Sequence, residues 1–100
     1  MKYNYYRFSL SSKENVSQVN FFLTTISGDC ILLGSTTNKF PQLPKDSRVD
    51  DPEVKTHIYY LKFNETADAY YVSVFAYDAS LYTIAAVVTR INSKNETVTS

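Results

Sequence analysis

The sequence predicts an all-β fold, a single antiparallel β-sandwich, and three observations support this. Nine of the 100 residues are Tyr and six are Phe, whereas only two are Gly. Aromatic and β-branched residues fit the pleated, half-buried surface of a sheet. Short segments of alternating apolar and polar residues are separated by turn-forming residues, and no segment has the period of a helix. We therefore expect a sandwich of about seven to eight strands.

The N-terminal half of the chain is predicted to contain three strands. Residues 3–10 and 16–25 alternate between apolar and polar side chains, which indicates two strands with one buried face each. Phe22 breaks the alternation of the second strand, so we expect its ring on the outer face. Residues 27–29 (Ser-Gly-Asp) are predicted to form a turn, and residues 30–34 a short strand buried on both faces.

The C-terminal half is predicted to begin with a long loop. Residues 35–55 contain three prolines and a charged run, so regular structure is hard to assign there. A loop of this length is usually functional or contains short strands of its own. Residues 56–63 are predicted to form one strand. Residues 70–77 and 81–91 are rich in aromatic and β-branched side chains, and we expect them to form the last hairpin around a turn at residues 78–80.

Length and charge limit the possible classes of protein. One hundred residues are enough for one domain, which we assign to residues 1–91, followed by a polar C-terminal tail at residues 92–100. Ten basic and ten acidic residues give a formal net charge of zero, so neither a nucleic acid nor an anionic membrane is an expected partner. No segment approaches the roughly 18 apolar residues that cross a bilayer, so membrane insertion is not expected. The single cysteine, Cys30, excludes an internal disulfide and is expected to be a buried strand residue.

Alternation along the strands divides the apolar residues into two sets. The inner set, expected to fill the core, comprises Phe8, Leu10, Val19, Phe21, Leu23, Leu32, Val72, Val74, Tyr82, Ile84 and Ala86. The outer set comprises Tyr5, Phe22, Tyr59 or Tyr60, Tyr71, Phe75 and Tyr77. A tyrosine ring combines apolar area with a polar tip, so Tyr71, Phe75 and Tyr77 are candidate residues for binding a protein or a glycan. Alternatively, these rings cover strand edges or pack under the long loop.

The sequence contains no arrangement typical of a catalytic site. His57 is the only histidine, and no nearby cysteine or second histidine completes a zinc-binding set. No serine lies in the glycine-flanked turn of a hydrolase nucleophile, and two isolated glycines do not make a phosphate-binding loop. We therefore expect that this chain is not an enzyme.

Three sequons are candidate glycosylation sites. They begin at Asn15, Asn64 and Asn95, each followed two positions later by Ser or Thr. All three fall in predicted turns or in the tail, where a glycan is tolerated. Their placement agrees with a secreted protein.

Several segments, taken in order, resemble a known family. They are Tyr6-Arg7-Phe8-Ser9-Leu10, Gly28-Asp29-Cys30-Ile31-Leu32-Leu33-Gly34-Ser35, Asn38-Lys39-Phe40-Pro41, the strand at residues 70–77, and Ser80-Leu81-Tyr82-Thr83-Ile84. Together they resemble the bacterial pre-peptidase C-terminal domain, a small jelly-roll-like β-sandwich appended to secreted peptidases and found in other surface proteins. The resemblance covers most of residues 3–91 and implies an extracellular or cell-surface location.

The resemblance also raises the question of calcium. Family members that bind calcium use acidic residues in and near the loop that here contains Asp29, which makes Asp29 a candidate metal ligand. The family's second acidic residue falls on Ile31, however, and calcium needs six to eight oxygen ligands. Asp29 would therefore need help from the long loop, by Asp46, Asp50, Asp51 or Glu53. The alternative is that Asp29 accepts backbone hydrogen bonds in its own turn.

These observations predict a non-catalytic module of a secreted or cell-surface protein. Such a module would bind a protein or a glycan, or would assemble with copies of itself into an extracellular structure. Assembly would proceed by addition of the extended arms at residues 1–6 and 97–100 to the sheet edge of a neighbour. The alternative is a calcium-stabilised accessory domain of a secreted peptidase or other hydrolase.

Overall fold

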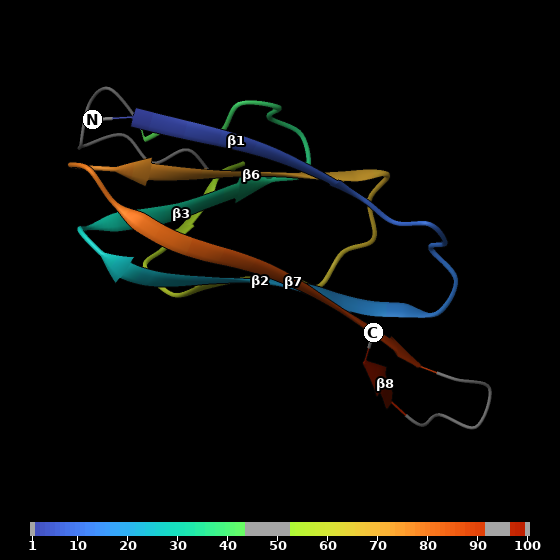
Figure 1. Ribbon diagram of the computed structural model, residues 1–100. Helices are drawn as coiled ribbons and strands as arrows, with labels where there is room; N and C mark the ends of the chain where they lie inside the picture. Colours follow the sequence, from blue (N-terminus) through green and yellow to red (C-terminus); the bar gives the residue numbers. More distant parts are fainter. Residues whose placement is uncertain (1, 44–52, 92–96, 100) are drawn as a thin grey trace.

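The computed structural model describes residues 2–43, 53–91 and 97–99 (Figure 1). Within these ranges the chain forms eight β-strands and no helix, so none of them contains a helix that could cross a membrane. The strands are β1 (Lys2–Ser9), β2 (Val16–Ser27), β3 (Cys30–Ser35), β4 (Lys55–His57), β5 (Tyr60–Phe63), β6 (Ala69–Ala76), β7 (Leu81–Ile91) and β8 (Thr97–Thr99).

The strands form two antiparallel sheets that pack face to face. Sheet A has the order β1-β6-β3-β4, and sheet B has the order β5-β2-β7-β8. Figure 1 shows β1, β6 and β3 in one layer and β2 and β7 in the other. Among the described strands, only the β3–β4 and β7–β8 connections stay within one sheet, and every other connection crosses between the sheets. The predicted all-β sandwich is therefore confirmed.

The core lies between the inner faces of the sheets, as the alternation predicts. Of the inner set, only Ala86 stays outside the core cluster; the other ten residues belong to it or pack against it. Ala86 is exposed because it lies on β7 where no strand of the described chain covers the outer edge of sheet B. Cys30 is buried, as expected, with 7% of its surface exposed.

The predicted last hairpin is wrong. β6 belongs to sheet A, where it pairs with β1 and β3, whereas β7 belongs to sheet B, where it pairs with β2. The chain therefore crosses between the sheets at residues 77–80. This crossing lies against the β2–β3 corner: the Tyr77 N–H donates a 3.1 Å hydrogen bond to the Asp29 carbonyl, and the Asp29 N–H donates one of 3.4 Å to Asp78 Oδ1.

The single strand predicted over residues 56–63 is two strands in different sheets. β4 pairs with β3 in sheet A, and β5 pairs with β2 in sheet B. The chain turns between them because His57 Nδ1 accepts backbone hydrogen bonds from Tyr59 (3.0 Å) and Tyr60 (3.2 Å). Alternation cannot reveal this change of sheet, since β4 has only three residues, all exposed, and only β5 alternates between exposed and buried positions.

The C-terminal segment predicted as a polar tail contains a strand. β8 pairs antiparallel with the end of β7, at Thr89–Ile91. The Thr-Val-Thr sequence of β8 is β-branched throughout, which favours an extended conformation. At the other end, β1 pairs with β6 over its whole length. The two arms that were expected to reach a neighbouring molecule thus include strands of the chain's own sheets.

Candidate functional site

The predicted aromatic face exists, but a loop covers its middle. Tyr71, Ser73 and Phe75 alternate along β6 on the side of sheet A that points away from the core. Ser73 is fully buried and only 8% of Phe75 is exposed, because residues 36–43 pass over this face. Phe75 was expected to be available to a partner, and the structure instead buries it, with its ring 4.8 Å from that of Tyr3. Tyr77 emerges at the far end of this face with 48% exposed, its ring 4.8 Å from that of Phe75.

Tyr71 marks the other end of the face, where a polar groove opens. The cavity here has a volume of about 510 Å³ and lies where β1 and β3 end and β6 begins. An adjoining cavity of about 270 Å³ shares Thr36, Thr37 and Glu65 with it, so the two form one continuous groove. We call this the polar groove; its polar and aromatic lining residues are Arg7, Lys13, Thr36, Thr37, Glu53, Lys55, Phe63, Glu65, Thr66, Asp68 and Tyr71.

Each wall of the polar groove is positioned by local structure. Arg7 and Tyr71 are cross-strand neighbours in sheet A, as are Tyr71 and Ser35 on the other side. The Ser35 hydroxyl accepts hydrogen bonds from the backbone N–H groups of Thr37 (3.1 Å) and Asn38 (2.9 Å). This turn holds the two threonines of the groove beside the Tyr71 strand.

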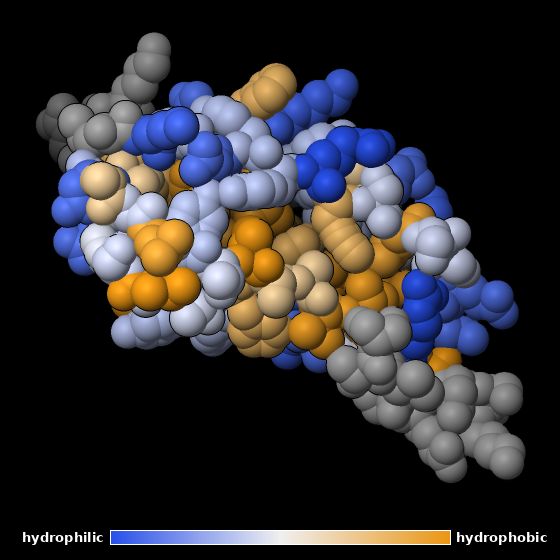
Figure 2. All heavy atoms as spheres, viewed as in Figure 1, coloured by the Kyte–Doolittle hydropathy of each residue, from blue (hydrophilic) through white to orange (hydrophobic). Residues whose placement is uncertain are grey.

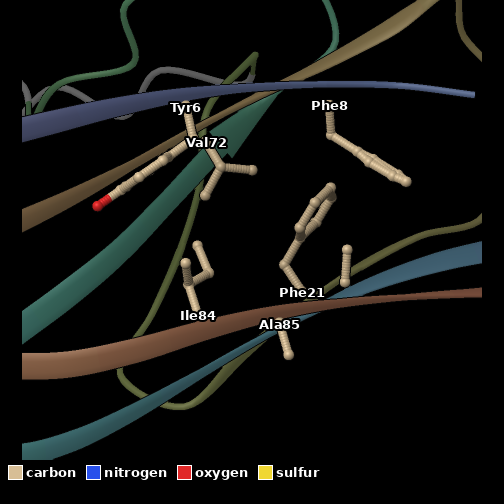
Figure 3. Close-up of a pocket in the computed structure, with 7 residues that line it drawn as sticks. Tyr6, Phe8, Phe21, Val72, Ile84 and Ala85 are labelled. Atoms are coloured by element: carbon tan, nitrogen blue, oxygen red, sulfur yellow. The ribbon is translucent and has the colours of Figure 1, made fainter.

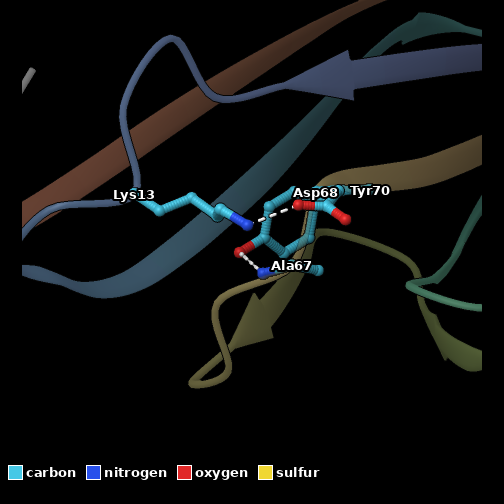
Figure 4. A network of polar contacts seen from close by, with 4 residues as sticks. All are labelled: Lys13, Ala67, Asp68 and Tyr70. Carbon is cyan, nitrogen blue, oxygen red and sulfur yellow. Dashed lines mark hydrogen bonds and ion pairs between the residues drawn. The ribbon is translucent and has the colours of Figure 1, made fainter.

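The charges of the polar groove are balanced. Its lining contains three cationic side chains and three carboxylates, and the Lys13 ammonium pairs with the Asp68 carboxylate across the mouth (Figure 4). The hydrogen bond and charge of Lys13 hold the pKa of Asp68 below its ordinary value. Asp68 therefore stays ionised at neutral pH. Both side chains of the pair are exposed to solvent, so the ion pair contributes little to the stability of the fold. It joins the segment before β2 to the β5–β6 turn beside the groove.

A buried tyrosine holds one wall of the polar groove in place. Tyr70 is fully buried, and its hydroxyl accepts a 3.2 Å hydrogen bond from the Ala67 N–H (Figure 4). The same hydroxyl donates a 2.8 Å hydrogen bond to the Glu65 carbonyl. Burial raises the pKa of Tyr70. These bonds fix the β5–β6 turn, which provides one wall of the groove.

A second surface, an apolar cleft, opens between the edges of the two sheets (Figure 3). It has a volume of about 150 Å³ and is lined by Tyr6, Phe8, Phe21, Val72, Ile84, Ala85 and Ala86. Figure 2 shows hydrophobic side chains gathered on this face of the molecule, between β1 and β7.

A tyrosine pair closes one end of the apolar cleft. The hydroxyls of Tyr6 on β1 and Tyr82 on β7 are 2.5 Å apart, and Asn4 Nδ2 donates a 2.9 Å hydrogen bond to the Tyr82 hydroxyl. Burial, together with the Tyr82 hydroxyl, raises the pKa of Tyr6 to about 12. These side-chain hydrogen bonds connect β1 of sheet A with β7 of sheet B.

A third group of exposed rings lies on sheet B. Phe22 and Tyr60 are directly opposite each other on β2 and β5, with 42% and 49% exposed. His57 packs against Tyr60 with ring centroids 4.5 Å apart, and Tyr59 is 65% exposed. The outer positions predicted for Phe22 and for Tyr59 or Tyr60 are therefore confirmed.

The candidate calcium ligand is far from one of its expected helpers. Asp29 lies at the start of β3, whereas Glu53 lines the polar groove beyond the other end of that strand. Asp46, Asp50 and Asp51 lie outside the described residues. No group of three His, Cys, Asp or Glu side chains suited to a metal ion is found in the described part of the chain. Calcium binding at Asp29 stays a prediction.

Two of the predicted sequons lie in exposed turns. Asn15 is exposed with a φ of 58°, just before β2, and Asn64 is exposed just after β5. Asn95 lies outside the described residues. Both described asparagines are sterically open to a glycan, and their glycosylation stays a prediction.

Searches for similar proteins do not assign the chain to a family. No family model, no curated protein and no solved structure matches it. The resemblance to the pre-peptidase C-terminal domain therefore stays a prediction.

Proposed function

We propose that the chain is a non-catalytic β-sandwich module of a secreted or cell-surface protein, and that it binds a neutral glycan in the polar groove. One observation carries the proposal. Tyr71, a half-buried aromatic residue, lines a cavity whose other walls are threonine hydroxyls and a balanced set of charged side chains.

The chemistry of the lining suits a sugar ring. A sugar has an apolar face of C–H groups and a rim of hydroxyls, so it is recognised by an aromatic ring together with donors and acceptors at its edge. Tyr71 supplies the ring, and Arg7 beside it on β1 supplies donors. Thr36 supplies a hydroxyl and follows Ser35, the neighbour of Tyr71 on β3. Because the cationic and anionic side chains are equal in number, the groove favours an uncharged ligand over a polyanion.

The groove has the size and rigidity of a binding site. Its two cavities, about 510 and 270 Å³, are comparable with small-molecule sites of roughly 300–1,000 Å³. Its walls are held by the Ser35 turn and by the two hydrogen bonds of the Tyr70 hydroxyl. A site that is ordered before binding loses less conformational entropy when the ligand arrives.

The ionised state of Asp68 favours binding without hydrolysis by this carboxylate. A glycosidase needs one carboxylic acid that is kept protonated near neutral pH by a raised pKa. The pKa of Asp68 is instead lowered by Lys13, so Asp68 is not suited to protonate a leaving group.

Binding of neutral oligosaccharides to matched variants tests the proposal. A glycan array identifies the best-bound neutral oligosaccharide, and calorimetry then compares wild type with Tyr71→Ala and with Tyr77→Ala. Tyr77 lies on the same face of sheet A but outside the groove, so it is the matched control. We expect roughly tenfold weaker binding for Tyr71→Ala, no change for Tyr77→Ala, and an unaltered sugar after incubation. Absence of binding, equal losses in both variants, or cleavage of the sugar would each overturn the proposal.

A further inference from the structure

Four turns of the described chain are closed by the same kind of hydrogen bond. In each, a side-chain acceptor binds the backbone N–H of the residue two positions later, which is a local bond typical of turns. The four bonds are Ser12 to Glu14 (3.2 Å), Ser35 to Thr37 (3.1 Å), Asn38 to Phe40 (2.9 Å) and His57 to Tyr59 (3.0 Å). Hydroxyl and amide oxygens keep the same protonation state between pH 5 and 8, whereas histidine changes its own in this range. The turn closed by His57 is therefore the one whose acceptor can be lost by protonation.

The hydrogen bonds of His57 require a neutral ring. The N–H groups of Tyr59 and Tyr60 both donate to Nδ1, at 3.0 and 3.2 Å. A ring nitrogen accepts only when it carries no proton, so the ring proton of the neutral form lies on Nε2. A second proton would bind Nδ1 and turn this acceptor into a donor, so both hydrogen bonds would be lost at once.

This turn positions exposed rings at the crossing between the sheets. It joins β4 of sheet A to β5 of sheet B. The Tyr59 carbonyl accepts a 2.8 Å hydrogen bond from the Leu23 N–H, and Tyr60 lies directly opposite Phe22. The His57 ring packs against the Tyr60 ring, with centroids 4.5 Å apart. A change at His57 would therefore alter how the rings of Tyr59 and Tyr60 are presented to solvent.

We propose that protonation of His57 releases the β4–β5 turn, which makes the crossing between the two sheets a pH-sensitive element. The turn is closed at higher pH and opens as the pH falls, because only the neutral ring accepts the two hydrogen bonds. His57 is exposed, so its charged ring can move into water. β5 stays in place because Leu61 and Phe63 are buried in the core, and the change is confined to residues 57–60. His57 lines neither cavity of the polar groove, so the switch goes beyond the proposed glycan binding.

Charged groups near His57 set the pH at which the turn opens. The titratable and charged residues on the neighbouring elements of the described chain are Lys55 on β4, Glu53 before it, Cys30 on β3, Lys62 on β5, and the ring neighbours Tyr59 and Tyr60. Leu32 of β3 lies directly opposite His57. The two lysines disfavour a further positive charge and the glutamate favours it. They do not change the outcome, because Nδ1 carries a proton in every imidazolium ring.

Nuclear magnetic resonance of wild type tests the switch directly. The 15N shifts of the His57 ring at pH 8 should show a proton on Nε2 and none on Nδ1. We expect solvent exchange of the Tyr59 and Tyr60 amides, divided by the rate of an unstructured peptide at the same pH, to rise about tenfold from pH 8 to pH 5. The Phe40 amide, which donates to Asn38 Oδ1, is the internal control and should not change. A proton on Nδ1 at pH 8, or an equal change at Phe40, would overturn the proposal.

Two variants of His57 separate the acceptor from its titration. His57→Asn keeps an acceptor at the same number of bonds from the backbone, and Asn38 already makes such a bond in this chain. We expect slow exchange of the Tyr59 and Tyr60 amides at both pH values in His57→Asn, and fast exchange at both in His57→Ala. Wild type should match His57→Asn at pH 8 and His57→Ala at pH 5, and circular dichroism confirms that each variant folds. Equal rises in His57→Asn and wild type, or wild type that stays slow at pH 5, would show that protonation of His57 does not open the turn.

Discussion

The Ser73 hydroxyl donates a 2.6 Å hydrogen bond to the Pro41 carbonyl on the side of sheet A that points away from the core. Both residues are fully buried, and so is Leu33 of the neighbouring strand β3. The loop is also held at its end, where the Leu43 N–H donates a 3.0 Å hydrogen bond to the Tyr3 hydroxyl. The sandwich thus has a second, smaller core under residues 36–43. This explains why the outer aromatic residues of β6 do not form one continuous binding surface.

Ser73→Ala should destabilise the protein by about 1–3 kcal/mol, because it leaves the buried Pro41 carbonyl without a hydrogen-bond donor. Urea unfolding followed by circular dichroism measures the change. Ser27→Ala, at an exposed position at the end of β2, is the control and should change stability little. Equal midpoints for both variants would show that the bond does not hold the loop.

Alternation along β6 correctly placed Tyr71 and Phe75 on the outer face, which Ser73 shares, and Val72 and Val74 in the core. The loop that buries Ser73 was beyond prediction, because its contact with Pro41 joins positions 32 residues apart and depends on tertiary packing. The turn at residues 78–80 was recognised, but a turn has the same composition whether it joins two strands of one sheet or two sheets. The crossing follows from the strand pairing, because β6 pairs with β1 and β3 whereas β7 pairs with β2.

The polar groove was likewise only partly predictable. Tyr71 was identified because its ring falls on the outer face, whereas Arg7, Thr36 and Glu65 were not. These residues come from separate segments, and single-sequence patterns do not show which loops meet at one end of a sandwich. Arg7 and Tyr71 lie side by side in the groove because they are directly opposite each other on β1 and β6.

Gly28→Ala should destabilise the protein by about 1–3 kcal/mol. Gly28 has a φ of +81°, which non-glycine residues adopt only with strain, and an added Cβ would lie 2.2 Å from Ser80 Oγ. The double variant with Ser80→Ala should recover part of the loss, because one of the close contacts is removed. Urea unfolding of both single variants and the double variant measures this coupling. A loss that is purely additive would show that only the backbone conformation matters.

Tyr70→Phe should cost about 1–3 kcal/mol of stability while the core stays packed. The change keeps the buried ring but removes the hydroxyl, so the Glu65 carbonyl and the Ala67 N–H lose their partner. Tyr59→Phe, at a ring that is 65% exposed, is the matched control and should be nearly neutral. Hydrogen exchange at the Ala67 amide should increase in Tyr70→Phe alone. An unchanged amide would mean that the turn is held by other contacts.

Alkaline pH should destabilise the protein partly through Tyr6. Its pKa is about 12 in the folded chain, because of burial and the nearby Tyr82 hydroxyl, and about 10 when unfolded. Between these values the unfolded chain releases a proton that the folded chain keeps, so stability is complete below pH about 10 and falls toward pH about 12. Because 40% of Tyr6 is exposed, solvent screening makes the loss of stability smaller than the pKa difference alone implies.

Melting temperatures across this pH range should decline less steeply in Tyr6→Phe than in wild type. The raised pKa of Tyr70 accounts for part of the decline that remains in the variant. Parallel curves for the two proteins would show that the Tyr6–Tyr82 contact does not couple ionisation to folding.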